Sequence, residues 1–308
     1  MSKCLITGGS GFIGKHFLKN IDGYVCVVRG SDKKLCSDTF TVHSINGDTD
    51  WSGAFDGIDV VVHLAGRAHS KNEGESESLE EYREVNTHGT TNLARQAAKA
   101  GVKRFIFVSS IGVNGPSTTN EPFNLGMKAE PQNPYARSKY EAELGLKKIA
   151  DETGLEVIIV RPTLVYGPNA PGNFEMLTRL VSKLPILPFG FANNRRDFIA
   201  VQNLADLLVT CANHPNAAGH IFLASDNETV SIKEFTNAIA KGLGKKVFQL
   251  PIPVSIMRLV GKITGKSAML EQLFGNLEVD SSNIQQVLGW TPPLTMEQAM
   301  ASLKNADK

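Results

Sequence analysis

The sequence has no long apolar run, few cysteines and almost no excess of charge. None of its apolar stretches approaches the roughly 20 residues that a membrane-spanning helix needs, which argues against an integral membrane protein. The formal net charge is only +1, so overall charge would attract neither nucleic acid nor an anionic membrane. No cluster of cysteines and histidines has the spacing of zinc ligands. We therefore expect no nucleic-acid partner, no membrane partner and no metal.

The four cysteines are scattered along the chain. Cys4 and Cys26 fall inside apparent core strands, and this placement is typical of buried thiols in a reducing compartment. The chain runs from Met1 almost directly into the first of these strands, which we interpret as leaving no room for a signal peptide. These features predict a soluble, cytoplasmic protein.

Short β-branched runs alternate with longer amphipathic stretches through the first half of the chain. This order predicts an α/β fold with a doubly wound, mostly parallel sheet and helices on both faces. After about residue 166 prolines break the chain, which indicates a smaller, mixed C-terminal domain that binds substrate. We expect residues 1–167 plus about 202–226 to form the first domain, and about 168–201 plus 227–308 to form the second. The expected strands span 3–7, 24–28, 41–46, 59–64, 104–109 and 157–161, the expected helices span 12–20, 79–100 and 134–152, and 204–212 and 221–224 should return to the main sheet.

A glycine-rich turn follows the first expected strand and opens the first expected helix. Gly8, Gly11 and Gly14 have the spacing that permits a tight turn, close approach of the backbone to a pyrophosphate, and packing of helix on strand. The helix start at Phe12 and Ile13 then offers N–H groups and a partial positive charge to the phosphates. The sequence therefore predicts a Rossmann-type sheet that binds a nicotinamide dinucleotide.

The end of the second strand bears on which dinucleotide binds. An acid usually stands there and accepts a hydrogen bond from the ribose 2′-hydroxyl of NAD, but here the strand ends in Arg29. A guanidinium suits the 2′-phosphate of NADP, so we favour NADP over NAD. A surface role for Arg29, with Asp32 reaching the ribose, is the alternative. Asp48, after the third strand, is expected to accept from the adenine amino group, unless it is a turn aspartate.

Ser109 and Ser110 end the fifth strand, at the sheet edge where ligands of parallel sheets bind. Pro134 suits a helix start, which puts Tyr135 and Lys139 one turn apart on one face. We expect Lys139 and an oxidised nicotinamide to lower the pKa of Tyr135 from its usual value of about 10. Tyr135 would then take a carbinol proton as a hydride leaves, or return one to a ketone. Ser110 would hydrogen-bond the reacting oxygen, and Lys139 would also hold the ribose hydroxyls.

Together these motifs resemble the extended short-chain dehydrogenase/reductase family, in its nucleotide-sugar epimerase/dehydratase branch. The resemblance covers nearly the whole chain and implies that Ser110, Tyr135 and Lys139 form the catalytic set. It implies a nucleotide sugar whose diphosphate meets Arg196 and whose nucleotide lies near Asn173; an ion pair of Arg196 with Asp197 is the alternative. The segments that carry the resemblance are 7–14, 47–48, 63–66, 85–90, 109–110, 135–139, 161–162, 165–168 and 196–199. The cofactor-binding residues expected in addition to those above are Leu64, Ala65, Gly66, Ser109 and Pro162.

The residues after Ser110 limit the reaction. Dehydratases of this branch have an acid pair there, whereas this chain has Ile111 and Gly112, which disfavours dehydration. Asn114 and Ala200 also depart from the tyrosine and histidine that are common in the family.

We expect a UDP-linked hexose, in N-acetylated form, to react at C4, in the synthesis of surface-polysaccharide precursors. An epimerase that retains NAD and a 4-keto reductase that uses NADPH both remain open. Another ketone or alcohol dehydrogenase of the family, or a non-catalytic NADP-sensing protein, is the alternative. The resemblance also implies a possible homodimer through helices 79–100 and 134–152.

Overall fold

The computed structural model describes residues 3–30, 36–68 and 78–305. Within these ranges, a seven-stranded parallel sheet has the order β10-β6-β5-β4-β1-β2-β3, which confirms the doubly wound α/β fold. The order reverses between β1 and β4, so a ligand crevice is expected at their carboxyl ends. The strands are β1 (Cys4–Thr7), β2 (Tyr24–Arg29), β3 (Thr39–Val42), β4 (Val60–His63), β5 (Arg104–Val108), β6 (Glu156–Pro162) and β10 (Ile221–Ala224).

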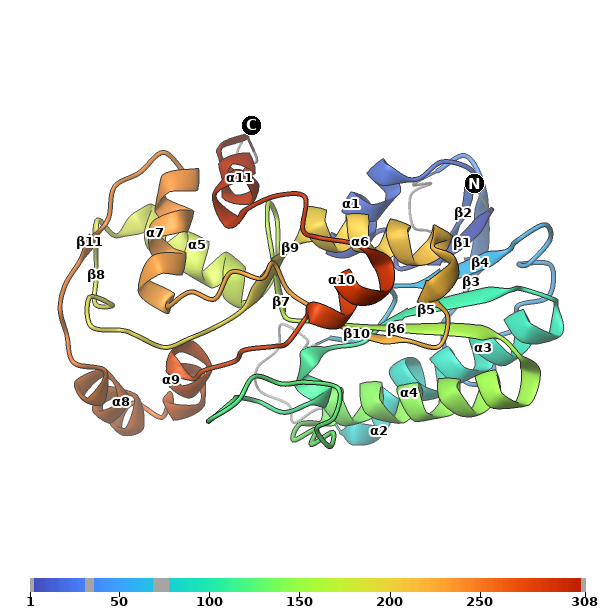
Figure 1. The fold of residues 1–308 in the computed structure, drawn as a ribbon, viewed down its shortest axis with the longest axis horizontal. Helices are drawn as coiled ribbons and strands as arrows, with labels where there is room; N and C mark the ends of the chain where they lie inside the picture. The colour runs from blue at the N-terminus through green and yellow to red at the C-terminus, as the bar shows by residue number, and fades with distance from the viewer. Residues whose placement is uncertain (1–2, 31–35, 69–77, 306–308) are drawn as a thin grey trace.

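Helices cover both faces of this sheet (Figure 1). Successive side chains of a strand point to opposite faces, so Leu5 joins one core while Ile6 joins the other. A strand buried on both faces needs a continuous apolar run, and the sequence supplies such runs in β1, β4 and β5. One face carries α1 (Phe12–Phe17), α6 (Val201–Asn213) and α10 (Ser282–Leu288); the other carries α2 (Leu79–Arg83), α3 (Thr90–Lys99) and α4 (Pro134–Thr153).

The expected helix at 79–100 is interrupted in the structure. A π-helical segment, Glu84–Gly89, separates α2 from α3. In this segment the Asn86 amide turns inward: it accepts from the Arg67 N–H at 2.8 Å and donates to Ser138 Oγ at 3.0 Å. The wider turn thus ties the chain after β4 to the helix that carries Tyr135 and Lys139, and π-bulges often lie near functional sites. The acidic stretch that precedes α2 lies largely outside the described residues. Ser78 caps α2: its hydroxyl accepts from the Glu81 N–H, and the Glu81 carboxylate accepts from the Ser78 N–H.

Two local expectations differ from the structure. The third strand spans Thr39–Val42 rather than 41–46, because the register with β2 ends at the pair of Arg29 and Val42. The structure also joins Cys26 to Cys36 in a disulfide, so the expectation of a thiol is wrong for Cys26. That pairing depends on how the segment before β3 lies against β2, which residue spacing does not reveal. Cys4 is a buried thiol as expected, and burial raises its pKa to about 11.

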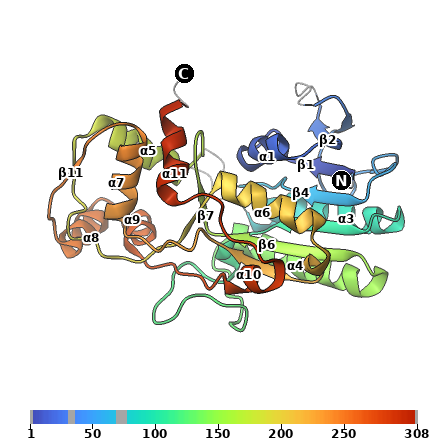
Figure 2. The same ribbon diagram turned by 45° about the horizontal axis from the view of Figure 1, so that its top comes forward.

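The later part of the chain contributes a second hydrophobic core with short elements (Figure 2). Tyr166, Phe174, Phe198 and Phe235 pack their rings together at its centre. None of the described helices is long and apolar enough to cross a membrane. The elements are β7 (Leu164–Tyr166), paired with β9 (Phe198–Ala200); β8 (Ile186–Leu187), paired with β11 (Phe248–Gln249); and the helices α5 (Asn173–Lys183), α7 (Ile232–Gly242), α8 (Val254–Ile263), α9 (Ser267–Phe274) and α11 (Met296–Ala301).

Candidate active site

The glycine-rich turn between β1 and α1 is closed tightly. Gly8 has a φ of +73°, and a Cβ there would lie 2.6 Å from the backbone nitrogen of Ala65. A Cβ at Gly14 would overlap the Gly8 carbonyl oxygen, and the Gly11 N–H donates to that same oxygen at 3.0 Å. The first turn of α1 has no side-chain cap, which leaves backbone N–H groups available to an anion. The turn therefore has the shape that a pyrophosphate requires.

The ends of β1 and β4 are fastened to each other beside this turn. Thr7 Oγ1 lies 2.7 Å from His63 Nδ1 and also accepts from the Ala65 N–H at 3.2 Å. His63 Nε2 lies 2.9 Å from Thr90 Oγ1, and burial lowers the pKa of His63 to about 3. His63 is thus a neutral, fully partnered core histidine that fixes Leu64, Ala65 and Gly66 at the crevice. Within the described residues no cluster of potential metal ligands occurs.

Lys139 lies below the carboxyl ends of β4 and β5. Its Nζ donates to the Val108 carbonyl at 3.0 Å and lies 4.6 Å from the centre of the Phe107 ring. A Cβ at Gly66 would lie only 3.1 Å from this Nζ, so a larger residue at the end of β4 would crowd the ammonium. Burial lowers the pKa of Lys139 to about 8, although nearby Glu143 opposes the shift. Lys139 is therefore a desolvated cation at the expected nicotinamide end of the crevice.

Tyr135 begins the helix that carries Lys139. Asn133 caps that helix by accepting from the Ala136 N–H at 2.7 Å, and Pro134 occupies its first turn. Burial raises the pKa of Tyr135 to about 12. This is the direction for the protein without its cofactor, because removal from water penalises the phenolate. The lowering expected with an oxidised nicotinamide in place stays a prediction. The phenol form is the stable one until further positive charge reaches the site.

Gly112 lies between Ser110 and the start of the same helix. The Gly112 N–H donates to Ser110 Oγ at 3.1 Å, and a Cβ at Gly112 would contact both that oxygen and the Cβ of Ala136. Ile111 and Gly112 have no ionisable side chain, so neither residue after Ser110 offers an acid or a base to the crevice. The structure thus brings Ser110, Tyr135 and Lys139 to one edge of the sheet, and their catalytic roles stay predictions.

Other residues expected to bind the cofactor lie along the same edge. Arg29 is exposed at the end of β2, and Asp32 lies outside the described residues. Asp48 is exposed, and its N–H donates to Asn46 Oδ1 at 3.1 Å in a turn. Pro162 is buried at the end of β6, in register with Ala224 of β10. These placements suit the expected contacts without testing them.

Arg196 and Asn173 belong to the second part of the chain. The Arg196 guanidinium donates to the Gly275 carbonyl at 2.9 Å, and burial lowers its pKa to about 10. The alternative ion pair is wrong, because Asp197 instead accepts from Thr229 Oγ1 at 2.5 Å and from the Val279 N–H at 2.7 Å. Arg196 is thus a partly desolvated cation held by a carbonyl rather than by a carboxylate. Asn173 is exposed at the first position of α5.

Comparison with known proteins agrees with this geometry. Residues 4–225 match the family described as the NAD dependent epimerase/dehydratase family. A UDP-glucose 4-epimerase of Vibrio cholerae is 43% identical over 309 residues, covering 98% of this chain and 94% of the relative. This chain belongs to the NAD dependent epimerase/dehydratase family.

Two more distant matches are informative. The chain is 24% identical, over 96% of its length and 92% of the relative, to an N-acetyl-alpha-D-glucosaminyl-diphospho-ditrans,octacis-undecaprenol 4-epimerase of Escherichia coli O157:H7. The solved structure of a UDP-glucose 4-epimerase of Thermotoga maritima with UDP-glucose has a TM-score of 0.75 at 21% identity, covering 99% of this chain and 98% of that one. The latter likeness supports the Rossmann-type fold.

Sequence reasoning missed a buried network behind Tyr135 and Lys139. Ser109 Oγ donates to Glu143 at 2.5 Å, and Arg161 contacts both oxygens of that carboxylate, at 2.9 and 2.5 Å. Arg161 also donates to Asn114 Oδ1 at 2.9 Å. The signal was present, because Glu143 lies on the apolar face of its helix, one turn after Lys139, and Arg161 interrupts an apolar strand. This network fixes the end of β5 against α4.

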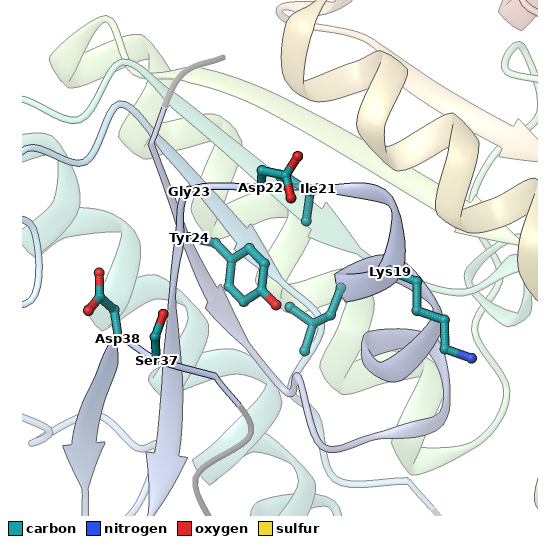
Figure 3. Close-up of a pocket in the computed structure, with 8 residues that line it drawn as sticks. Lys19, Ile21, Asp22, Gly23, Tyr24, Ser37 and Asp38 are labelled. Atoms are coloured by element: carbon teal, nitrogen blue, oxygen red, sulfur yellow. The ribbon is translucent and has the colours of Figure 1, made fainter.

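A cavity of about 300 Å³ lies away from all of these residues (Figure 3). It is bounded by the end of α1 and the starts of β2 and β3, with the Tyr24 ring beside it. This is the amino edge of the parallel sheet, whereas the ligands of such folds bind at the carboxyl edge. The cavity is therefore not the cofactor site. Its lining residues are Leu18, Lys19, Ile21, Asp22, Gly23, Tyr24, Ser37 and Asp38.

Proposed function

We propose that this member of the epimerase family interconverts the C4 epimers of a UDP-linked hexose. The observation that carries the proposal is the convergence of Ser110, Tyr135 and Lys139 on the carboxyl ends of β4 and β5, next to the glycine-rich turn. When bound there, a nicotinamide cofactor supplies the acceptor and donor of the hydride. The 43% identity to a UDP-glucose 4-epimerase over almost the whole chain favours epimerisation over the other reactions of the family.

Tyr135 handles the proton in the proposed reaction. As the sugar C4–H bond gives up a hydride, the O4–H proton passes to the Tyr135 phenolate and a ketone remains. After the hydride returns to the opposite face of C4, the phenol gives the proton back to O4, so that protons and electrons balance. Because burial holds the Tyr135 pKa at about 12, the phenolate forms only with support from positive charge. The ammonium of Lys139 and a cationic nicotinamide would provide that charge.

Ser110 and Arg196 would hold the two ends of the substrate. The Ser110 hydroxyl can donate to the reacting oxygen, since its own oxygen accepts from the Gly112 N–H. Arg196 offers a partly desolvated guanidinium to a diphosphate, and no carboxylate lies within ion-pair distance of it among the described residues. The diphosphate-linked N-acetylglucosamine in the name of the Escherichia coli relative supports a diphosphate-linked, N-acetylated hexose.

A 4-keto reductase is the second candidate, favoured by Arg29. This arginine is exposed at the end of β2, where it is free to meet the 2′-phosphate of NADP. The two candidates differ in whether the cofactor leaves the enzyme oxidised.

The test identifies the cofactor released from the purified protein and then follows two reactions. We expect the protein to interconvert UDP-N-acetylglucosamine and UDP-N-acetylgalactosamine, or the corresponding UDP-hexoses, with no net consumption of NADH or NADPH. Tyr135→Phe should bind the cofactor yet lose turnover. Consumption of NADPH only with a UDP-4-keto-6-deoxy sugar would replace the epimerase proposal by the reductase.

The Arg29→Asp variant tests the choice of dinucleotide. We expect the ratio of the Kd of NADP to that of NAD to rise at least about 10-fold, because a carboxylate repels the 2′-phosphate and accepts from the 2′-hydroxyl. Titration of the cofactor-free protein with each dinucleotide measures the ratio, and Arg95→Asp on α3 is the surface control. An unchanged ratio would remove the argument from Arg29.

A further inference from the structure

Helix α8 presents an apolar stripe to solvent. Its side chains at the spacing i, i+3, i+4 and i+7 fall on one side of the helix. We call these four residues the α8 stripe; they are Ile256, Leu259, Val260 and Ile263, with exposed fractions of 52%, 59%, 52% and 78%. A surface helix normally turns such a stripe toward the core and its charges outward. The α8 stripe therefore requires an explanation other than folding of the chain on itself.

The other side of α8 already supplies the intramolecular packing. Val254 and Met257 pack against the second hydrophobic core, and Gly261 is buried where Leu270 of α9 approaches it. Because α8 is anchored by this second apolar side, the α8 stripe is additional to what the fold needs. Exposed apolar side chains that are adjacent on one side of a helix, rather than scattered singly, are typical of an interaction surface.

The charges beside the α8 stripe are basic. Arg258 and Lys262 lie between the stripe and the packed side of the helix, and Lys266 follows its end. The one acid in residues 251–275 is Glu271, which is 3.2 Å from Arg258 and so offsets that charge. Lys262 and Lys266 are exposed, and no ion pair of theirs occurs among the described residues. The surface thus combines apolar side chains with a local excess of positive charge.

We propose that the α8 stripe docks the protein on the surface of an anionic lipid bilayer. An amphipathic helix lying in the interface plane buries its apolar side chains at the acyl boundary while its lysines meet anionic headgroups. The net charge of +1 does not argue against this, because the attraction is local. The expectation of no membrane partner rested on overall charge and on the lack of a spanning segment, and neither addresses this surface.

A bilayer fits better than a second copy of the chain. In a two-fold dimer the same patch meets itself, so the lysines beside the α8 stripe would face one another without an acid to offset them. A bilayer instead supplies negative charge and an extended plane. Figures 1 and 2 both place α8 and β11 at the end of the molecule opposite β2, where Phe248 and Ile186 are also exposed, at 62% and 53%.

The test is flotation of the full chain with vesicles. One set consists of phosphatidylcholine alone and the other of equal parts of phosphatidylcholine and phosphatidylglycerol. We expect the protein to float with the anionic vesicles at low salt, and to remain at the bottom of the gradient with the neutral ones. Added salt should weaken the binding because it screens the headgroup charge. Failure to float with the anionic vesicles would overturn the proposal.

Two variants separate the apolar and the charged contributions. Leu259→Glu/Ile263→Glu should abolish flotation, because it places carboxylates where the bilayer boundary would be. Lys262→Gln/Lys266→Gln, which removes only exposed charges and so leaves the fold intact, should weaken partition about 30-fold. The control is Lys19→Glu/Asn20→Glu, which places two carboxylates at exposed residues just after α1 on the other part of the molecule and should float like the parent. Equal flotation of all four proteins would also overturn the proposal.

Sedimentation without vesicles tests the competing occupant. If the parent chain forms a dimer that Leu259→Glu/Ile263→Glu breaks, and neither protein binds vesicles, the α8 stripe belongs to a second copy and the proposal is wrong. The inference goes beyond the proposed epimerase reaction and does not depend on it. Turnover of a water-soluble UDP-sugar should be unchanged in the α8 variants, so loss of flotation and loss of activity are read separately.

Discussion

Four buried or partly buried cations divide into two kinds. Arg161 contacts the Glu143 carboxylate, and Arg104 contacts the Glu156 carboxylate. Lys139 instead donates to the Val108 carbonyl, and Arg196 donates to the Gly275 carbonyl. Among the described residues neither of them forms an ion pair. A carbonyl satisfies one donor without neutralising the charge. The first pair is therefore engaged in holding the fold, whereas the second pair keeps charge available for a ligand.

Burial shows the same division in energetic form. Desolvation lowers the pKa of Lys139 to about 8 and that of Arg196 to about 10. Without a ligand, each of these cations therefore carries a desolvation cost in free energy, which an anionic or polar ligand would offset. The comparison teaches that a buried cation without a carboxylate is the better sign of a functional site, and four experiments test it.

The largest expected effect is that of Lys139→Met on turnover. We expect kcat to fall about 10²- to 10⁴-fold, because the proton transfer at Tyr135 loses its supporting charge. The free energy of unfolding should stay the same or rise, because a desolvated ammonium is removed. Steady-state kinetics and thermal unfolding measure the two quantities. Lys103→Met, at a lysine 75% exposed on the surface, is the control. A large loss of stability in Lys139→Met would break the comparison.

Arg161→Met should act in the opposite way, mainly on stability. Removing the guanidinium leaves the Glu143 carboxylate buried without its cation, so we expect a loss of about 3–5 kcal/mol in the free energy of unfolding. Urea denaturation measures this loss. The double variant Glu143→Gln/Arg161→Met should recover part of it, since no uncompensated charge remains. No recovery in the double variant would mean that the cost arises from packing rather than from charge.

Arg196→Met should change binding more than stability. We expect the KM for a UDP-sugar to rise about 10- to 100-fold, because that is the typical contribution of a hydrogen bond to a charged group. The free energy of unfolding should change by at most about 1 kcal/mol. The adjacent Arg195, which is 63% exposed and paired with Glu278, gives the matched control Arg195→Met, which should leave KM unchanged. Equal KM values for the two variants would remove Arg196 from the substrate site.

The smallest expected effect concerns pH. Below pH 8 Lys139 is protonated, and above it the charge is lost, so we expect kcat/KM to decline on the alkaline side from about pH 8. The contribution to stability has the opposite sign: between about 8 and 10.5 the unfolded chain binds the proton that the folded chain has released, so this group makes unfolding less favourable as pH rises. A pH profile of turnover, beside melting curves over the same range, measures both trends. An alkaline limb that is unchanged in Lys139→Arg would assign it to another group.

Much of the cofactor half could be predicted from the sequence because its signals are local. Period-two and continuous apolar runs placed the strands, and β10 (Ile221–Ala224) spans the same residues that were expected to return to the sheet. Gly8 and Gly14 stand where any side chain would meet backbone, so their identity indicated the close approach directly. The pairing of Tyr135 with Lys139 followed from helix periodicity alone.

What the tertiary structure decided depends on contacts between distant residues. The disulfide of Cys26, the bond from Ser109 to Glu143 and the partners of Asp197 join segments whose relative register no local pattern encodes. The direction of the Tyr135 pKa shift was also decided there, because burial is a property of the whole fold. The α8 stripe shows the same limit: its periodicity is plain in the sequence, but only packing shows which side faces water. By itself the sequence determined the fold class and predicted the reacting residues; packing decided which buried cations contact a carboxylate and which donate only to a carbonyl.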